Sequence, residues 1–269
     1  MHPIPFVKMA ASGNDFVVID NRRKIVADPV RFAGEICALH TGAGADGLLL
    51  LETSKKAAFK MRIINSDGSE AEACGNGFRC IARFAKERLG LPSLFRFESL
   101  SGEIEARAEG KKITVQLVTP SDFRPRAEIE VRGHRLHYSF INAGVPHTVI
   151  FVEGLPKIDV ENLGRAIRYH DRFKPRGTNV NFAEVEAASE IHVRTYERGV
   201  ERETLACGTG STASAVVSSL LGYTRPPVRV RTRGGEILTV DFTSNGKKAD
   251  HVTLEGEAHF VYDGNWVKS

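Results

Sequence analysis

The sequence predicts an α+β fold of two pseudo-symmetric domains produced by internal duplication. The first observation is a near repeat, because segments 73–80 and 206–213 share Ala-Cys-Gly-x-Gly at the start of a helical pattern. The second is that upstream segments recur in the same order and at nearly the same spacing: 12–19 with 143–150, 45–52 with 179–186, and 65–74 with 198–207. This alignment places Ala45 opposite Asn179. The repeated unit is roughly 130 residues, the size of one domain.

Alternation of apolar and polar residues is the third observation, because it predicts many strands. The predicted strands are 59–64, 113–117, 191–196, 228–231 and 237–242. Apolar helical patterns cover 80–89, which Gly90 and Pro92 end, and 211–221, which Gly222 and Pro226 end. Each half is therefore expected to run strand, loop, cysteine, central helix and further strands. This order is typical of an α+β fold rather than of regular βαβ alternation.

The domain boundaries follow from the polar segment 121–126, which contains Pro125 and is expected to connect the two halves. The predicted domains are 1–121 and 122–256. The strand-like tail at 259–262 is expected to return to the first domain, so that 257–269 belongs with it.

Composition limits the class of protein. Hydrophobic residues make up 42% and charged residues 26% of 269 residues, and the net charge of +4 argues against a nucleic-acid or lipid surface. No apolar run approaches the roughly 20 residues of a membrane span, and Pro3, Pro5 and Lys8 do not suit a secretory signal. Four cysteines are too few for a disulfide scaffold, and no C-x-x-C or H-x-x-x-H pair suggests a metal site. A cytoplasmic protein without a metal is expected.

Cys74 and Cys207 are the strongest functional candidates. Each is predicted at a helix start, where free backbone N–H groups and the helix dipole favour thiolates and other anions. A single cysteine at either position is explained by packing as a small hydrophobe. Recurrence in both halves, followed each time by Gly-x-Gly, favours a reactive thiol beside open backbone.

The loops before the cysteines carry further polar groups. The segments 65–69 and 197–199 are each predicted to leave a strand and turn through a glycine ahead of a helix start that can hold a carboxylate. The glycines match neither a dinucleotide fingerprint nor a phosphate loop. Two matched thiols suit proton transfer at an amino acid α-carbon, in which one thiolate removes a proton from one face and the other thiol protonates the opposite face. Backbone N–H groups would stabilise the developing enediolate.

The chain resembles the cofactor-independent diaminopimelate epimerases over nearly its whole length. The segments that carry the resemblance are 13–16, 42–46, 65–77, 146–147, 179–180 and 197–210. The resemblance implies two domains, each a mixed sheet or barrel around a central helix, with the active site in the cleft between them. It also implies epimerisation of LL- to meso-diaminopimelate for lysine and peptidoglycan synthesis, no cofactor, and a homodimer.

The resemblance also assigns roles to individual residues. Cys74 and Cys207 are the implied acid and base thiols. The implied substrate-binding residues are Asn14, Asn65, Gly75, Asn76, Asn179, Glu197, Arg198, Gly208 and Thr209. The reacting carboxylate would be held by Gly75, Asn76, Gly208 and Thr209. The distal carboxylate would be held by Asn65, Asn179 and Arg198. The distal ammonium would be held by Glu197. His147 and Glu197 would tune the thiols.

Two positions depart from the family pattern, and two other functions stay open. Val145 stands where many members have asparagine, and Gly47 where some have glutamine. A sister racemase for another amino acid, such as histidine or proline, would use the same thiols, and a binding protein would need neither. If the thiols face one carbon, oxidation could join Cys74 to Cys207. Cys37 and Cys80 are expected to be structural.

Overall fold

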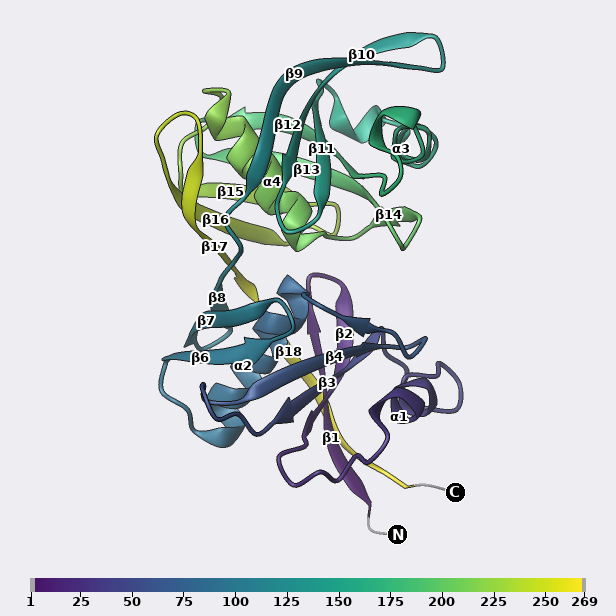
Figure 1. The fold of residues 1–269 in the computed structure, drawn as a ribbon, viewed down its shortest axis with the longest axis vertical. Coiled ribbons are helices and arrows are strands. Elements are labelled where there is room, and N and C mark those ends of the chain that lie inside the picture. The colour runs from purple at the N-terminus through teal and green to yellow at the C-terminus, as the bar shows by residue number, and fades with distance from the viewer. Residues whose placement is uncertain (1–2, 268–269) are drawn as a thin grey trace. The chain divides into compact units, whose positions relative to one another are not determined.

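The structure is a computed structural model that describes residues 3–267. It divides into two compact units. Unit 1 contains the chain up to Gln116 and again from Gly256, and unit 2 contains Leu117–Glu255. In each unit, strands surround one central helix, α2 (Gly75–Leu89) in unit 1 and α4 (Gly208–Leu220) in unit 2 (Figure 1). None of the helices between residues 3 and 267 combines the length and apolar character needed to span a membrane.

Unit 1 is a mixed sheet. Besides α2, it contains β1 (Ile4–Ala11), β2 (Asn14–Asp20), α1 (Pro29–Ile36), β3 (Gly47–Glu52), β4 (Lys60–Asn65), β5 (Glu70–Ala71), β6 (Leu94–Ser99), β7 (Gly102–Glu109), β8 (Lys112–Gln116) and β18 (His259–Trp266). The pairs β2–β3 and β4–β6 are parallel. The pairs β1–β2, β3–β4, β4–β5, β6–β7 and β7–β8 are antiparallel, and β18 pairs antiparallel with β1.

Unit 2 repeats this plan. Besides α4, it contains β9 (Ser121–Val131), β10 (His134–Asn142), β11 (Pro146–Phe151), η1 (Leu155–Lys157), α3 (Val160–Arg168), η2 (Asp171–Phe173), β12 (Asn179–Ala187), β13 (Glu190–Glu197), β14 (Arg202–Thr204), β15 (Val228–Thr232), β16 (Ile237–Ser244) and β17 (Ala249–Glu257). β11–β12 and β13–β15 are its parallel pairs, in the places of β2–β3 and β4–β6. The predicted α+β fold of two similar halves is confirmed.

The two central helices are buried for different reasons. α2 places large apolar side chains such as Phe78, Ile81 and Phe84 against the surrounding strands. α4 consists mainly of small residues, and Gly208 and every residue of 210–218 are buried, as expected for a helix enclosed on all sides. Both helices begin before the predicted apolar runs, α2 five residues and α4 three residues earlier, because each cysteine caps its helix and the Gly-x-Gly segment forms the first turn.

Two predictions about the chain path were wrong. Segment 121–126 is the first part of β9 rather than a connection. β9 pairs with β10, its first residues are largely exposed, and Pro125 lies at a break in the pairing, where no N–H is needed. The alignment of Ala45 with Asn179 was also wrong. Phe16 pairs with Gly47 in unit 1, whereas His147 pairs with Asn179 in unit 2, so Gly47 is the counterpart of Asn179.

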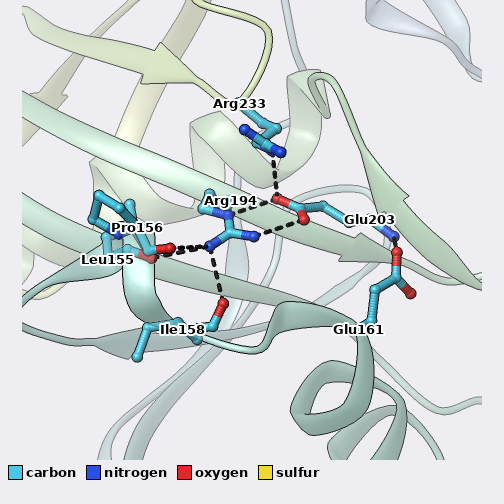
Figure 2. A network of polar contacts seen from close by, with 7 residues as sticks. All are labelled: Leu155, Pro156, Ile158, Glu161, Arg194, Glu203 and Arg233. Carbon is cyan, nitrogen blue, oxygen red and sulfur yellow. Dashed lines mark hydrogen bonds and ion pairs between the residues drawn. The ribbon is translucent and has the colours of Figure 1, made fainter.

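An arginine–glutamate pair ties down the short strand before each cysteine. In unit 1, Nε and Nη2 of Arg62 donate to the two carboxylate oxygens of Glu70, both at 2.8 Å. In unit 2, Arg194 binds Glu203 in the same way at 2.7 and 2.8 Å (Figure 2). Such bidentate contacts are stronger and more directional than single hydrogen bonds. The same arginine–glutamate contact therefore fixes β5 and β14, the short strands that precede Cys74 and Cys207.

The pair in unit 2 belongs to a larger network. Nη1 of Arg194 donates to the carbonyl oxygens of Leu155, Pro156 and Ile158, at 2.9 to 3.5 Å (Figure 2). The Glu203 backbone N–H donates to the Glu161 carboxylate on α3 at 2.8 Å. One guanidinium therefore joins β13 and β14 to η1, while Glu203 joins β14 to α3.

Candidate functional site

Each candidate thiol is the N-cap of its central helix. The Sγ of Cys74 accepts a hydrogen bond from the Gly77 N–H at 3.4 Å, and the Sγ of Cys207 accepts one from the Gly210 N–H at 3.4 Å. The Thr209 hydroxyl also lies 3.5 Å from the Cys207 sulfur. Because the first N–H groups of a helix and its dipole stabilise negative charge, both positions favour a thiolate. The predicted placement of both cysteines at helix starts is confirmed.

The second glycine of the motif is needed for packing in unit 2. A Cβ on Gly210 would lie 2.4 Å from Oδ1 of Asn181 and 3.2 Å from Oγ1 of Thr195. Asn181 cannot move away easily, because its amide also donates to the Thr148 carbonyl at 3.1 Å and accepts from Thr195 at 2.9 Å. The first turn of α4 is therefore pressed against a fixed polar side chain.

This contact predicts that Gly210→Ala destabilises the protein by about 2–4 kcal/mol, because overpacking displaces a buried, hydrogen-bonded group. Gly34→Ala on α1 is the matched control, since the nearest atom to its added Cβ is 4.0 Å away. That change should gain about 0.5–1 kcal/mol through helix propensity. Urea unfolding of both variants measures the difference. Equal unfolding midpoints for the two would contradict the packing argument.

The predicted binding residues of unit 1 lie around Asp46. Asn76 donates from Nδ2 to Oδ1 of Asn14 at 2.6 Å, and Asn14 donates from Nδ2 to the Asp46 carboxylate at 3.0 Å. Asn65 ends β4 and donates to the Ser69 hydroxyl at 2.9 Å. Its turn is tied to Asp46 by the next residue, whose N–H donates to the Asp46 carbonyl at 3.2 Å. The structure therefore joins Asn14 and Asn76 directly and brings the Asn65 turn beside them.

The predicted binding residues of unit 2 include a half-buried cation, Arg198. The backbone N–H of Arg198 donates to Oδ1 of Asn179 at 2.8 Å, and its Nη1 donates to the Arg176 carbonyl at 3.2 Å. Within residues 3–267 no carboxylate forms an ion pair with Arg198. Burial lowers the pKa of the Arg198 guanidinium, and the neighbouring charges of Arg168 and Arg176 lower it further. This surrounding positive charge suits a bound anion.

His147 is fully buried beside these groups. Its Nδ1 lies 3.1 Å from the Asn181 amide nitrogen, which also donates to a carbonyl, so Nδ1 acts as the acceptor and the ring proton is assigned to Nε2. Burial, and secondly the charge of Arg198, lower the pKa of His147 to about 3. The ring is therefore neutral at physiological pH. Sequence reasoning missed Asn181 and Thr195, which occupy strand positions that look like ordinary core.

The buried neutral ring predicts an acid-dependent loss of stability. Below a pH near 6.5 the unfolded state binds a proton at His147, whereas the folded state does not until the pH reaches about 3. Between pH 7.5 and pH 5 the wild type should therefore lose about 2 kcal/mol more unfolding free energy than His147→Gln. Urea unfolding of both proteins at the two pH values tests this. Parallel pH dependences would show that the ring is already charged in the folded state.

Cys37, Cys80 and Glu197 are the remaining residues that the sequence analysis singled out. Cys37 is buried, and burial raises the pKa of its thiol to about 12, so it stays protonated at neutral pH. Cys80 is enclosed on α2. Glu197 is half-buried and ends β13, directly before Arg198.

Comparisons with known proteins give matches to one family over nearly the whole chain. The diaminopimelate epimerase family model matches residues 6–121 and 139–261, which is one match in each half. The diaminopimelate epimerase of Aquifex aeolicus (strain VF5) is 47% identical over 272 residues, covering 96% of each chain. That of Methanocella arvoryzae is 41% identical over 278 residues, covering 98% of this chain and 97% of the relative. The chain belongs to the diaminopimelate epimerase family.

Membership in the diaminopimelate epimerase family makes this chain an isomerase of the epimerase type. Solved structures extend the same fold beyond the family. A phenazine biosynthesis protein of the PhzF family from Bacillus anthracis gives a TM-score of 0.76 at 14% identity and covers 100% of both chains. A hydroxyproline epimerase from Agrobacterium vitis gives a TM-score of 0.72 at 17% identity, covering 99% of this chain and 91% of its own.

The structure places both departures from the diaminopimelate epimerase family pattern. Val145 lies in the turn between β10 and β11, where its carbonyl accepts the Ala143 N–H at 3.1 Å. Gly47 begins β3 and is buried, and a Cβ there would lie 3.0 Å from the Ile64 carbonyl oxygen. A larger side chain at position 47 would require the neighbouring strand to shift by a few tenths of an ångström.

Proposed function

We propose that this chain converts LL-diaminopimelate to meso-diaminopimelate in lysine and peptidoglycan precursor synthesis, without pyridoxal phosphate. The observation that carries the proposal is the pair of cysteines, Cys74 and Cys207, each capping the central helix of its unit in the same way. Full-length relatives named diaminopimelate epimerase support the substrate.

Proton transfer in this proposal uses one thiol as base and the other as acid. The thiolate of one cysteine takes the α-proton from one face, and the thiol of the other gives a proton to the opposite face. The α-carbon electrons pass into the carboxylate as an enediolate during the transfer. Backbone N–H groups of Gly75 and Asn76 and of Gly208 and Thr209 hold that carboxylate and stabilise its added charge.

The distal end of the substrate is held by a second set of groups. Arg198, a cation without an ion-pair partner in the described chain, binds the distal carboxylate together with Asn179 and Asn65. Glu197 binds the distal ammonium group, and Asn14 lines the pocket. Glu197 and the neutral His147 tune the thiols, because a neutral ring can hydrogen-bond without adding charge.

The assembly and location complete the proposal. The enzyme acts as a homodimer in the cytoplasm, with one small-molecule substrate and no nucleic-acid or membrane partner. Sedimentation equilibrium of the purified protein measures the oligomeric state, and a monomer at working concentration would remove that part of the proposal.

The function is tested by NMR of the purified protein in heavy water without added cofactor. LL-diaminopimelate, L-histidine and L-proline are supplied in separate samples. Deuterium should enter the α-position of diaminopimelate alone, and the meso form should appear. Exchange only in another amino acid would identify a sister racemase that uses the same thiols. Binding without exchange in any sample would identify a binding protein.

A further inference from the structure

A directed chain of hydrogen bonds in unit 1 runs from Arg79 to Asp46. Arg79 is fully buried on α2, and its Nη2 donates to Oδ1 of Asn76 at 3.0 Å and to the Ser12 hydroxyl. Asn76 then donates from Nδ2 to Oδ1 of Asn14 at 2.6 Å, and Asn14 donates from Nδ2 to Asp46 at 3.0 Å. Every hydrogen bond in the series therefore runs in the same direction, from Arg79 as the first donor to Asp46 as the last acceptor.

The Asp46 end of this chain is held in place. Its accepting oxygen also takes the backbone N–H of Asp15 at 3.1 Å, and the Asp46 N–H donates back to the Asp15 carboxylate at 3.0 Å. The other Asp15 oxygen lies 2.7 Å from the ammonium of Lys8, which is buried. These reciprocal bonds keep the Asp46 carboxylate facing Asn14, although Asp46 itself is exposed.

The two ends determine how the amides between them are turned. A guanidinium only donates hydrogen bonds and a carboxylate only accepts them, whereas an asparagine amide can be turned either way. With Arg79 at one end and Asp46 at the other, one orientation of each amide satisfies every bond. Turning over either amide would set two nitrogens or two oxygens against each other. The charged ends therefore select the orientation of Asn76 and Asn14.

We propose that Arg79 and Asp46 are positioning residues that orient the Asn76 and Asn14 amides for a substrate carboxylate. The proposal rests on the proposed function. Each amide donates one N–H within the network, and Asn14, which is half-exposed, keeps a second N–H for a carboxylate oxygen. Asn76 lies in the first turn of α2, so fixing its side chain also fixes the backbone N–H groups beside Cys74.

The first test is Asn76→Asp, which preserves the shape of the side chain and is read without substrate. A carboxylate beside buried Arg79 forms an ion pair, so without a fixed orientation the variant would be as stable as the wild type or more so. In the directed network, the second carboxylate oxygen of the introduced aspartate lies against Oδ1 of Asn14. The two oxygens repel each other, because the bond to Asp46 prevents the Asn14 amide from turning over. We therefore expect a lower urea midpoint. An unchanged or higher midpoint overturns the proposal.

The second test compares Arg79→Met with Arg79→Lys in the epimerisation assay. Methionine removes the donor, whereas lysine keeps a group that only donates. KM for Arg79→Met should rise on the order of tenfold, the factor for one net hydrogen bond, with a smaller change in kcat. Arg79→Lys should recover part of this loss. Equal KM values for the two variants, both folded by urea titration, would overturn the positioning role.

The two tests also separate this inference from the proposed function. If the wild type does not exchange the α-proton of diaminopimelate, the proposed function and the substrate part of the inference both fail. The Asn76→Asp midpoint still decides whether the network has a direction. If the wild type is active and that midpoint does not fall, the inference alone fails.

Discussion

The Cys74→Ser and Cys207→Ser variants are each expected to lose about 10²- to 10⁴-fold in kcat for diaminopimelate epimerisation, the usual contribution of a positioned acid or base. Serine keeps the N-cap, because its hydroxyl also accepts the N–H three residues later. Folding should therefore be preserved in both variants. An alcohol, however, is a far poorer acid and base than a thiol with a reference pKa near 8.5.

Deuterium incorporation and meso product are measured together by NMR for these variants. Cys37→Ala and Cys80→Ala are the matched controls, because both remove a buried thiol from unit 1. They should keep near-normal rates. The double variant Cys74→Ser/Cys207→Ser should lose about as much as either single one, since groups that act as a unit are not additive. A single variant with near-normal turnover would contradict the two-base assignment.

The Arg198→Ala variant is expected to lose about 2–4 kcal/mol of transition-state binding, or roughly 30- to 900-fold in kcat/KM for diaminopimelate. The guanidinium is half-buried near Arg168 and Arg176, and no carboxylate of the described chain forms an ion pair with it, so in the proposed function the distal carboxylate of the substrate offsets its charge. Removing it leaves the distal carboxylate unpaired. The loss should appear mainly in KM, because the contact is made before and during proton transfer alike.

Arg202→Ala provides the control for this prediction. Arg202 is an exposed arginine on β14, four residues further along the chain, and its removal should leave kcat/KM within about twofold, as for most surface changes. Steady-state kinetics of both variants with diaminopimelate measures the two kcat/KM values. If Arg198→Ala keeps its kcat/KM for diaminopimelate, Arg198 does not bind the distal carboxylate, and that part of the proposed function fails.

Local patterns were sufficient to predict the placement of the thiols. Cys74 and Cys207 were placed correctly because Gly-x-Gly followed by an apolar run is a strong local signal for the start of a buried helix. The loop glycines at 68 and 199 both have positive φ, as expected for turns that follow a strand. These features depend on neighbouring residues only.

Features that depend on pairing between distant strands could not be predicted. β9 was missed because an exposed edge strand with a proline has the composition of a loop. The helix α1 was missed because it is short, although Asp28 caps it. The burial of Arg79 was not predicted, since an arginine on a helix is almost always exposed and one of its partners, Ser12, lies 67 residues away in the sequence.

The duplicated Arg62–Glu70 and Arg194–Glu203 pairs have a consequence for protein engineering. They hold the approach to each cysteine in the same way, while the side chains behind the helices have diverged: Phe16, Leu49 and Ile63 in unit 1 correspond to His147, Asn181 and Thr195 in unit 2. Substitutions at these six positions can therefore change the packing around one cysteine while the arginine–glutamate pair that holds the strand before it stays intact.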